Sequence, residues 1–147
     1  MTVRYLAATE LLAAHLSGID RPTASVPMAE LAISAVSLEW ILADAELDEE
    51  ISAPERNNWR TNVTNFRNLL IQSGGMVTAV SEDCLEQWGK AILLKLEHQF
   101  DGEPEAMSSE ERLVVATAKE LGLIYLTPAR DWNETLRSDF GLAIEEA

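Results

Sequence analysis

The sequence has few of the residues that build redox centres or sites for soft metals. Cys84 is the only cysteine, and His15 and His98 are the only histidines. An internal disulfide and a zinc site with several cysteine ligands are therefore excluded, and a histidine-rich metal centre is not expected. Cys84 also has no accompanying histidine pattern, so we do not expect a thiol nucleophile.

Long apolar runs are missing as well. The most apolar stretch, residues 26–43, is interrupted by Glu30 and Glu39 and is shorter than the roughly 20 residues that a membrane helix needs. The first residues do not show the basic, apolar and small-residue order of a secretory signal. We therefore expect a cytoplasmic protein with no membrane segment.

Basic residues are scarce relative to acidic ones, which leaves a net charge of −14. This charge repels a polyanion, so non-specific binding of nucleic acid is not expected. It suits a metal site, a basic partner peptide or a solvated acidic surface. One stripe of a predicted helix concentrates basic side chains, namely Arg56, Arg60 and Arg67. These arginines contact RNA phosphates or an acidic partner segment in one interpretation, and only solvent in the other.

Apolar residues make up 47% of the 147 residues, which is typical of one globular domain, here residues 1–147. Short apolar runs predict strands, and helical periodicity predicts helices between them. The predicted strands are 3–7, 31–36, 76–80 and 123–126, with an edge strand at 142–144. The predicted helices are 10–16, 38–47, 55–70, 110–121 and one that begins after Ser81. This alternation predicts an α/β fold with a mainly parallel sheet of four to five strands covered by helices.

Polar residues predict where the helices begin and what connects them. Thr9, Ser37 and Ser81 are expected to cap helices at their N-termini. In the helix after Ser81, an apolar stripe containing Leu85 and Ile92 is expected to face the core. A loop containing Pro22 and Pro27 follows the first helix, and residues 101–109 are expected to form a polar loop. The segment around Pro128 is expected to be irregular.

Side chains that follow parallel strands gather at one edge of the sheet, where such folds place their functional sites. The candidates are the residues at 8–10, 37–39 and 127–131, together with Glu110 and Glu111 at the start of a helix. Several of them are carboxylates, which are ligands that Mg²⁺ or Mn²⁺ prefers. Glu111 has a structural alternative, because Ser108 and Glu111 have the spacing of a helix capping box. The four tryptophans, at 40, 59, 88 and 132, are expected in the core or at a dimer interface.

Four segments carry a resemblance to a known family. They are RYLAATELLAAHL (4–16), ELAISAVSLEW (30–40), SEDCLEQWGKAILLKL (81–96) and EERLVVATAKELGLIYLTPARDW (110–132). In this order they resemble the PIN-domain family, and within it the VapC-like toxin ribonucleases. The resemblance implies a three-layer α/β/α fold, acidic residues that hold Mg²⁺ or Mn²⁺, and a metal-activated hydroxide that attacks an RNA phosphodiester. It also implies an antitoxin-like protein partner, whose tail blocks the active site, and a homodimer.

The resemblance assigns roles to individual residues. Catalytic and metal-binding roles pass to Glu39, Glu111 and Asp131, and Glu10 becomes a further metal ligand. Thr9 and Thr127 match threonines of the family and, with the three arginines, become candidates for contact with substrate. The register of Glu39 is shifted by about one residue, since the family more often has its helix glutamate at the position of Trp40.

Two positions depart from the acidic pattern of the family. Ala8 lies where the first aspartate is expected, and Ala129 lies where a fourth acid or asparagine is common. Glu10, in turn, replaces an asparagine. An introduced substitution at Ala8 would leave Ala129 and Glu10 unexplained. Two interpretations remain: a ribonuclease with impaired or lost activity that uses Mg²⁺ or Mn²⁺, or an inactive PIN-like domain without a cofactor that binds a partner protein.

Overall fold

The computed structural model describes residues 2–18 and 26–147, and its centre is a sheet of five strands in the order β3-β2-β1-β6-β7. Every neighbouring pair in this sheet is parallel. The strands are β1 (Tyr5–Ala7), β2 (Leu31–Ser34), β3 (Met76–Thr78), β6 (Ile124–Thr127) and β7 (Ile144–Glu146). The predicted parallel sheet is thus confirmed, including its edge strand. The loop expected around Pro22 lies outside the described residues.

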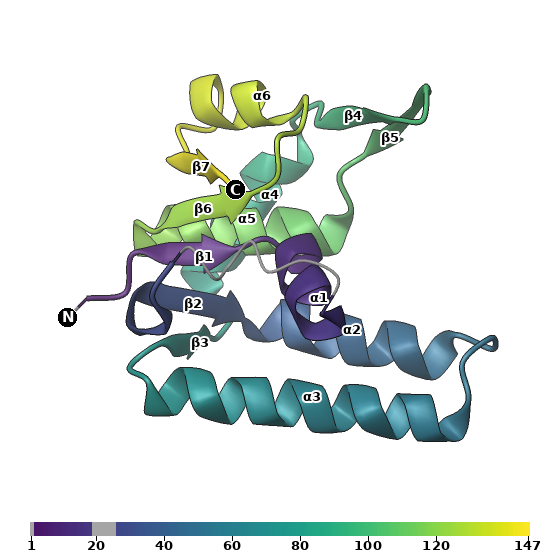
Figure 1. Cartoon of the computed structure of the whole chain (residues 1–147). Coiled ribbons are helices and arrows are strands. Elements are labelled where there is room, and N and C mark those ends of the chain that lie inside the picture. Colours follow the sequence, from purple (N-terminus) through teal and green to yellow (C-terminus); the bar gives the residue numbers. More distant parts are fainter. Residues whose placement is uncertain (1, 19–25) are drawn as a thin grey trace.

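Helices flank this sheet, as the sequence pattern predicts (Figure 1). Helix α5 packs against β1 and β6, α4 packs against α5, and α2 contacts α1, α3 and α5. The helices are α1 (Thr9–Ser17), α2 (Ala35–Leu47), α3 (Ala53–Gln72), α4 (Glu82–Ile92), α5 (Ser109–Leu121) and α6 (Asn133–Ser138), with a 3₁₀ turn at Met28–Glu30. No described helix combines the length and the apolar character needed to cross a bilayer.

Strand β1 lies in the middle of the sheet and fixes which segments meet at its carboxyl edge. Leu6 is level with Ala32 of β2 and with Tyr125 of β6. The N–H of Ala8 continues the ladder by donating to the carbonyl oxygen of Leu126 at 2.8 Å. Helices α1 and α2 begin where β1 and β2 end (Figure 1). The starts of these helices and the end of β6 therefore lie close together.

Two of the three predicted helix caps are wrong. Ala8 occupies the N-cap of α1, and Ser34 caps α2 by accepting from the Val36 N–H. Thr9 and Ser37 instead lie inside their helices, and their hydroxyl oxygens are 2.7 Å apart. Helix α2 starts earlier than expected because β2 ends at Ser34, two residues before its predicted end, and α1 starts one residue earlier than expected. Two hydroxyls therefore lie between α1 and α2. The Ser81 cap of α4 is confirmed.

The apolar stripe predicted after Ser81, which runs through Leu85, Trp88, Ile92 and Leu96, is only partly confirmed, because Leu96 is buried and Trp88 is half-buried. Leu85 and Ile92 are 45% and 42% exposed, whereas Cys84 and Ala91 are buried. The small side chains of Cys84 and Ala91 allow α4 to pack closely on α5, and this turns the larger apolar residues toward the surface.

The expected polar loop at 101–109 contains part of a β-hairpin. Strands β4 (Glu97–Phe100) and β5 (Glu103–Ala106) pair antiparallel around Asp101 and Gly102, which have φ values of 51° and 83°. Two successive residues with positive φ form the tight turn that an Asp-Gly pair favours. The segment around Pro128 is irregular as expected, because residues 128–132 form neither helix nor strand, but the short helix α6 that follows it was not predicted.

Gly75 lies where the end of α3 approaches the start of β2 closely. A Cβ atom there would lie 2.5 Å from Leu70 Cδ1 and 2.5 Å from the Met28 carbonyl oxygen. We predict that Gly75→Ala lowers the free energy of unfolding by roughly 1–3 kcal/mol because of this overpacking. Gly89→Ala, in α4 with nothing within 4 Å of its Cβ, is the control and should raise stability by up to about 1 kcal/mol. Urea unfolding measures both, and equal effects of the two variants would contradict this packing.

Candidate functional site

A cavity of about 470 Å³ opens beside the carboxyl ends of β1 and β6. Four of the predicted site residues line it: Thr9, Glu10, Glu111 and Thr127. The remaining lining residues come mostly from α1, α2, α3 and α5; they are Ala8, Ala13, Trp40, Ile41, Asp44, Ala45, Asp48, Ile51, Trp59, Ser108, Glu110, Tyr125 and Trp132. The parallel topology thus brings together residues that are far apart in the sequence, as expected.

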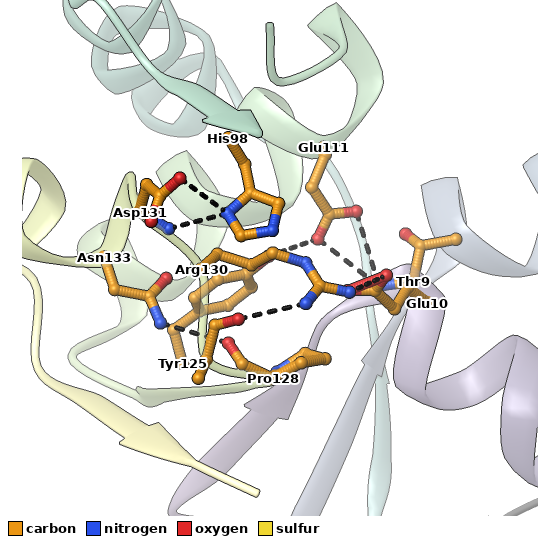
Figure 2. A network of polar contacts seen from close by, with 10 residues as sticks. Thr9, Glu10, His98, Glu111, Tyr125, Pro128, Arg130, Asp131 and Asn133 are labelled. Carbon is orange, nitrogen blue, oxygen red and sulfur yellow. Dashed lines mark hydrogen bonds and ion pairs between the residues drawn. The ribbon is translucent and has the colours of Figure 1, made fainter. Parts of the chain in front are cut away.

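Glu111 links three elements of the site. Its backbone N–H donates to Ser108 Oγ, so Ser108 caps α5 as predicted. Its carboxylate does not return to the cap but accepts from the Thr9 N–H, with both oxygens 3.3 Å from the nitrogen (Figure 2). The Tyr125 hydroxyl donates to the same carboxylate at 2.5 Å. The capping-box expectation is therefore half correct, and Glu111 joins α5 to the start of α1 and to β6.

Burial is the main cause of the pKa shifts of Glu111 and Tyr125. Burial raises the pKa of Glu111 above its ordinary value, while hydrogen bonds from Thr9 and Tyr125 lower it in part and the charge of Glu10 raises it again. Burial, together with the Glu111 carboxylate, raises the pKa of Tyr125 well above its ordinary value. The Tyr125 hydroxyl therefore keeps its proton and remains a donor to Glu111.

Arg130 is a site residue that the sequence did not reveal. It follows β6, and its Nη2 lies 2.6 Å from Glu10 Oε2 (Figure 2). The Arg130 side chain is 20% exposed, and its guanidinium lies over the Phe100 ring, 5.1 Å from the ring centre. The aromatic contact and the partial burial hold the guanidinium in place. One carboxylate of the cavity is therefore neutralised from within the chain.

Asp131 lies beside the cavity but does not line it. Its carboxylate accepts from the Gln99 N–H at 3.1 Å, and its own N–H donates to His98 Nδ1 at 2.9 Å. Asp131 Oδ2 is also 3.1 Å from His98 Nδ1. His98 Nδ1 thus contacts both the main-chain N–H and the carboxylate of Asp131, and the Gln99 amide also holds that carboxylate. Through these contacts with His98 and Gln99, Asp131 links strand β4 to the segment after β6.

Glu39 and the arginine stripe lie away from the cavity. Glu39 is exposed on α2, and Trp40 lines the cavity in its place. Arg56 donates to the Ala45 and Asp48 carbonyl oxygens, at 3.3 and 2.8 Å, and so closes the C-terminal end of α2. Of the other two arginines, Arg60 pairs with Glu46 on α2, and Arg67 is exposed on α3.

The donor set does not fit a hard divalent cation. Such a cation needs several oxygen ligands directed at one point. Ala8 supplies no side-chain oxygen, and Glu10 faces a guanidinium. Within residues 2–18 and 26–147, no three His, Cys, Asp or Glu side chains are grouped as metal ligands. Ala129, the second gap in the acidic pattern, is exposed and does not line the cavity.

We predict that Glu111→Gln stabilises the fold as the pH rises. A carboxyl whose pKa is raised by folding costs no stability below its ordinary pKa, because it is protonated in both states. The cost appears as the pH rises from that value through the raised one, because a charge must then be buried. Urea unfolding between pH 4 and pH 8 should show that the free energy of unfolding of the variant rises relative to that of the wild type across this window. Glu105→Gln, on the exposed strand β5, controls for the lost charge, and parallel pH curves for the wild type and Glu111→Gln would contradict the assignment.

Comparison with known proteins relates this geometry to solved structures. No family model and no curated protein matches the sequence. Among solved structures, VapBC2 from Rickettsia felis, bound to a DNA fragment from its promoter, matches with a TM-score of 0.66 and 13% identity over 99% of this chain and 98% of that chain. FitAcB from Neisseria gonorrhoeae matches with a TM-score of 0.66 and 14% identity over 95% of both chains.

A third similar structure is VapBC-5 from Mycobacterium tuberculosis, a member of the VapBC family of toxin–antitoxin systems. It matches with a TM-score of 0.63 and 12% identity over 99% of this chain and 98% of that chain. Identities this low carry an argument about the fold only. The sheet order, the flanking helices and these matches agree, and this chain has the PIN fold.

Proposed function

We propose that this chain is a PIN-fold binding module that pairs with an antitoxin-like protein and does not hydrolyse RNA with a divalent metal. The ion pair between Arg130 and Glu10 carries this proposal. It neutralises a carboxylate at the edge of the site, where Ala8 already lacks a ligand oxygen. Each change weakens the attraction for a divalent cation, and together they leave this edge of the site without two of the ligand charges that such an ion would use.

A protein partner is supported by the similar structures and by charge. The chain shares its fold with components of VapBC and FitAcB structures. Its net charge of −14 favours a partner with a basic segment and disfavours RNA, which the same charge repels. A cytoplasmic location and a homodimer belong to the same proposal, and sedimentation of the isolated chain tests the dimer.

A metal-dependent ribonuclease is the second candidate. One observation favours it, because five carboxylates line the same cavity: Glu10, Asp44, Asp48, Glu110 and Glu111. A weak Mg²⁺ or Mn²⁺ site there would support residual hydrolysis of RNA.

The two candidates predict different results with metal and RNA. We expect the wild type to cleave RNA in Mn²⁺ no faster than the Glu10→Gln/Glu111→Gln double variant, and calorimetry to detect no Mn²⁺ binding. Ala8→Asp combined with Arg130→Gln should gain Mn²⁺ binding, because it adds one carboxylate and releases another. Ala8→Asp alone should gain less. Mn²⁺-dependent cleavage by the wild type that disappears in the Glu10→Gln/Glu111→Gln variant would establish the ribonuclease instead.

The partner is tested by coexpression with an antitoxin-like protein, sought as a small open reading frame beside this gene. We expect a complex that survives gel filtration at low ionic strength and weakens as salt screens the attraction between the two chains. Charge-reversed variants of the partner's basic segment should lose the complex, whereas charge-reversed variants elsewhere on its surface should retain it. Two separate peaks at low salt would count against the proposed pairing.

A further inference from the structure

The cavity has aromatic and aliphatic side chains in its walls, which a site for a metal ion does not require. Tryptophan side chains reach it from three different elements: Trp40 from α2, Trp59 from α3 and Trp132 at the start of α6. Ile41 and Ile51 add aliphatic surface. Trp40 is 45% exposed although it borders the cavity, so a ligand there would cover surface that is open to solvent. The indoles give the cavity apolar surface, and the face of an indole attracts a cation.

The charged side chains that line the described part of the cavity have one sign, although Arg56, which does not line it, donates to the carbonyl oxygens of Ala45 and Asp48. None of the described lining residues is lysine, arginine or histidine, and Arg130 at the edge is already paired with Glu10. Asp44 and Glu110 have no ion-pair partner among residues 2–18 and 26–147. An anion, including an RNA phosphate, would meet repulsion here, whereas a cation would meet unneutralised carboxylates.

Apolar walls combined with unneutralised carboxylates favour one kind of cation. A small metal ion needs converging oxygens, and no such group is found in the described chain. A cation with apolar groups on its nitrogen is weakly hydrated, so it loses little on leaving water. It is attracted both by tryptophan faces and by nearby carboxylates. The volume of about 470 Å³ falls in the range of small-molecule sites.

We propose that this cavity binds a free small organic cation of the alkylammonium class, with Trp40 and Trp59 contacting its apolar groups and Asp44, about one helical turn from Trp40 on α2, supplying an unpaired charge. The proposal rests on the proposed function, because a resident divalent metal would compete for the carboxylates that attract the organic cation. This proposal assigns a class of small ligand to a cavity for which the proposed function names none.

The experiment uses the purified chain and two ligands of matched shape. Choline is the probe, and 3,3-dimethyl-1-butanol, with the same shape but no charge, is its control. Calorimetry at constant ionic strength measures both affinities. We expect saturable binding of choline, at least about tenfold tighter than that of the alcohol, because only the cation gains from the rings and carboxylates. Equal affinities, or no saturable binding of choline, would overturn the proposal.

Variants locate the site. Trp40→Leu and Asp44→Asn should each weaken choline binding roughly three- to tenfold, and both positions are exposed enough to tolerate the change. Their controls are Trp88→Leu and Asp83→Asn on α4, which lie outside the cavity and should retain wild-type affinity. Circular dichroism and urea midpoints verify folding. Equal losses in the control variants would also overturn the proposal.

A third arm separates a free ligand from a basic side chain of a partner protein. A blocked tripeptide with a central arginine should bind more weakly than choline. Tighter binding of the peptide would overturn the assignment to a free ligand. A chain that neither binds Mn²⁺ nor cleaves RNA, and also ignores choline, would leave the proposed function standing and reject this inference alone.

Discussion

The hydrogen-bonded position of β1 between β2 and β6 is the constraint on which the rest of the site depends. Parallel pairing on both sides of β1 brings the start of α1, the start of α2 and the end of β6 to one edge. Neither Glu10 nor Arg130 belongs to a strand, yet each is placed by the strand before it, and they meet although 120 positions separate them. A register shift of one residue in β1 would exchange its two faces and separate this pair.

The same edge concentrates negative charge, and the chain manages it in two ways. Arg130 neutralises Glu10 by direct contact. Glu111 has no ion-pair partner among residues 2–18 and 26–147 and is stabilised by the Thr9 N–H and the Tyr125 hydroxyl, at the N-terminal end of α1 where the helix dipole is positive. Burial still raises its pKa, so these donors offset only part of the cost of burying the charge. Hydrogen-bond donors thus supply part of the stabilisation of negative charge that a metal ion supplies in an acidic site.

The sequence predicted the sheet well and the site only in part, for physical reasons. Continuous apolar runs are required by strands buried on both faces, so the strands were visible. The β4–β5 hairpin was not, because its exposed strands lack an apolar pattern and only Asp101-Gly102 signals the turn. The site edge was predictable because parallel topology places it. The pairing of Arg130 with Glu10 was not, since it depends on how the segment after β6 folds over the sheet.

Trp40 shows how one position can change the character of a site. A carboxylate at this place on α2 would add a ligand oxygen and a negative charge to the cavity, whereas an indole adds a large apolar face and no charge. Ala8, which also lines the cavity, acts in the same direction, because alanine has no side-chain oxygen and leaves more space than an aspartate. A metal site becomes weaker with each change, but a site for an apolar cation becomes stronger, since it needs contact area and a diffuse negative potential rather than converging oxygens. The features that argue against one ligand therefore argue for the other.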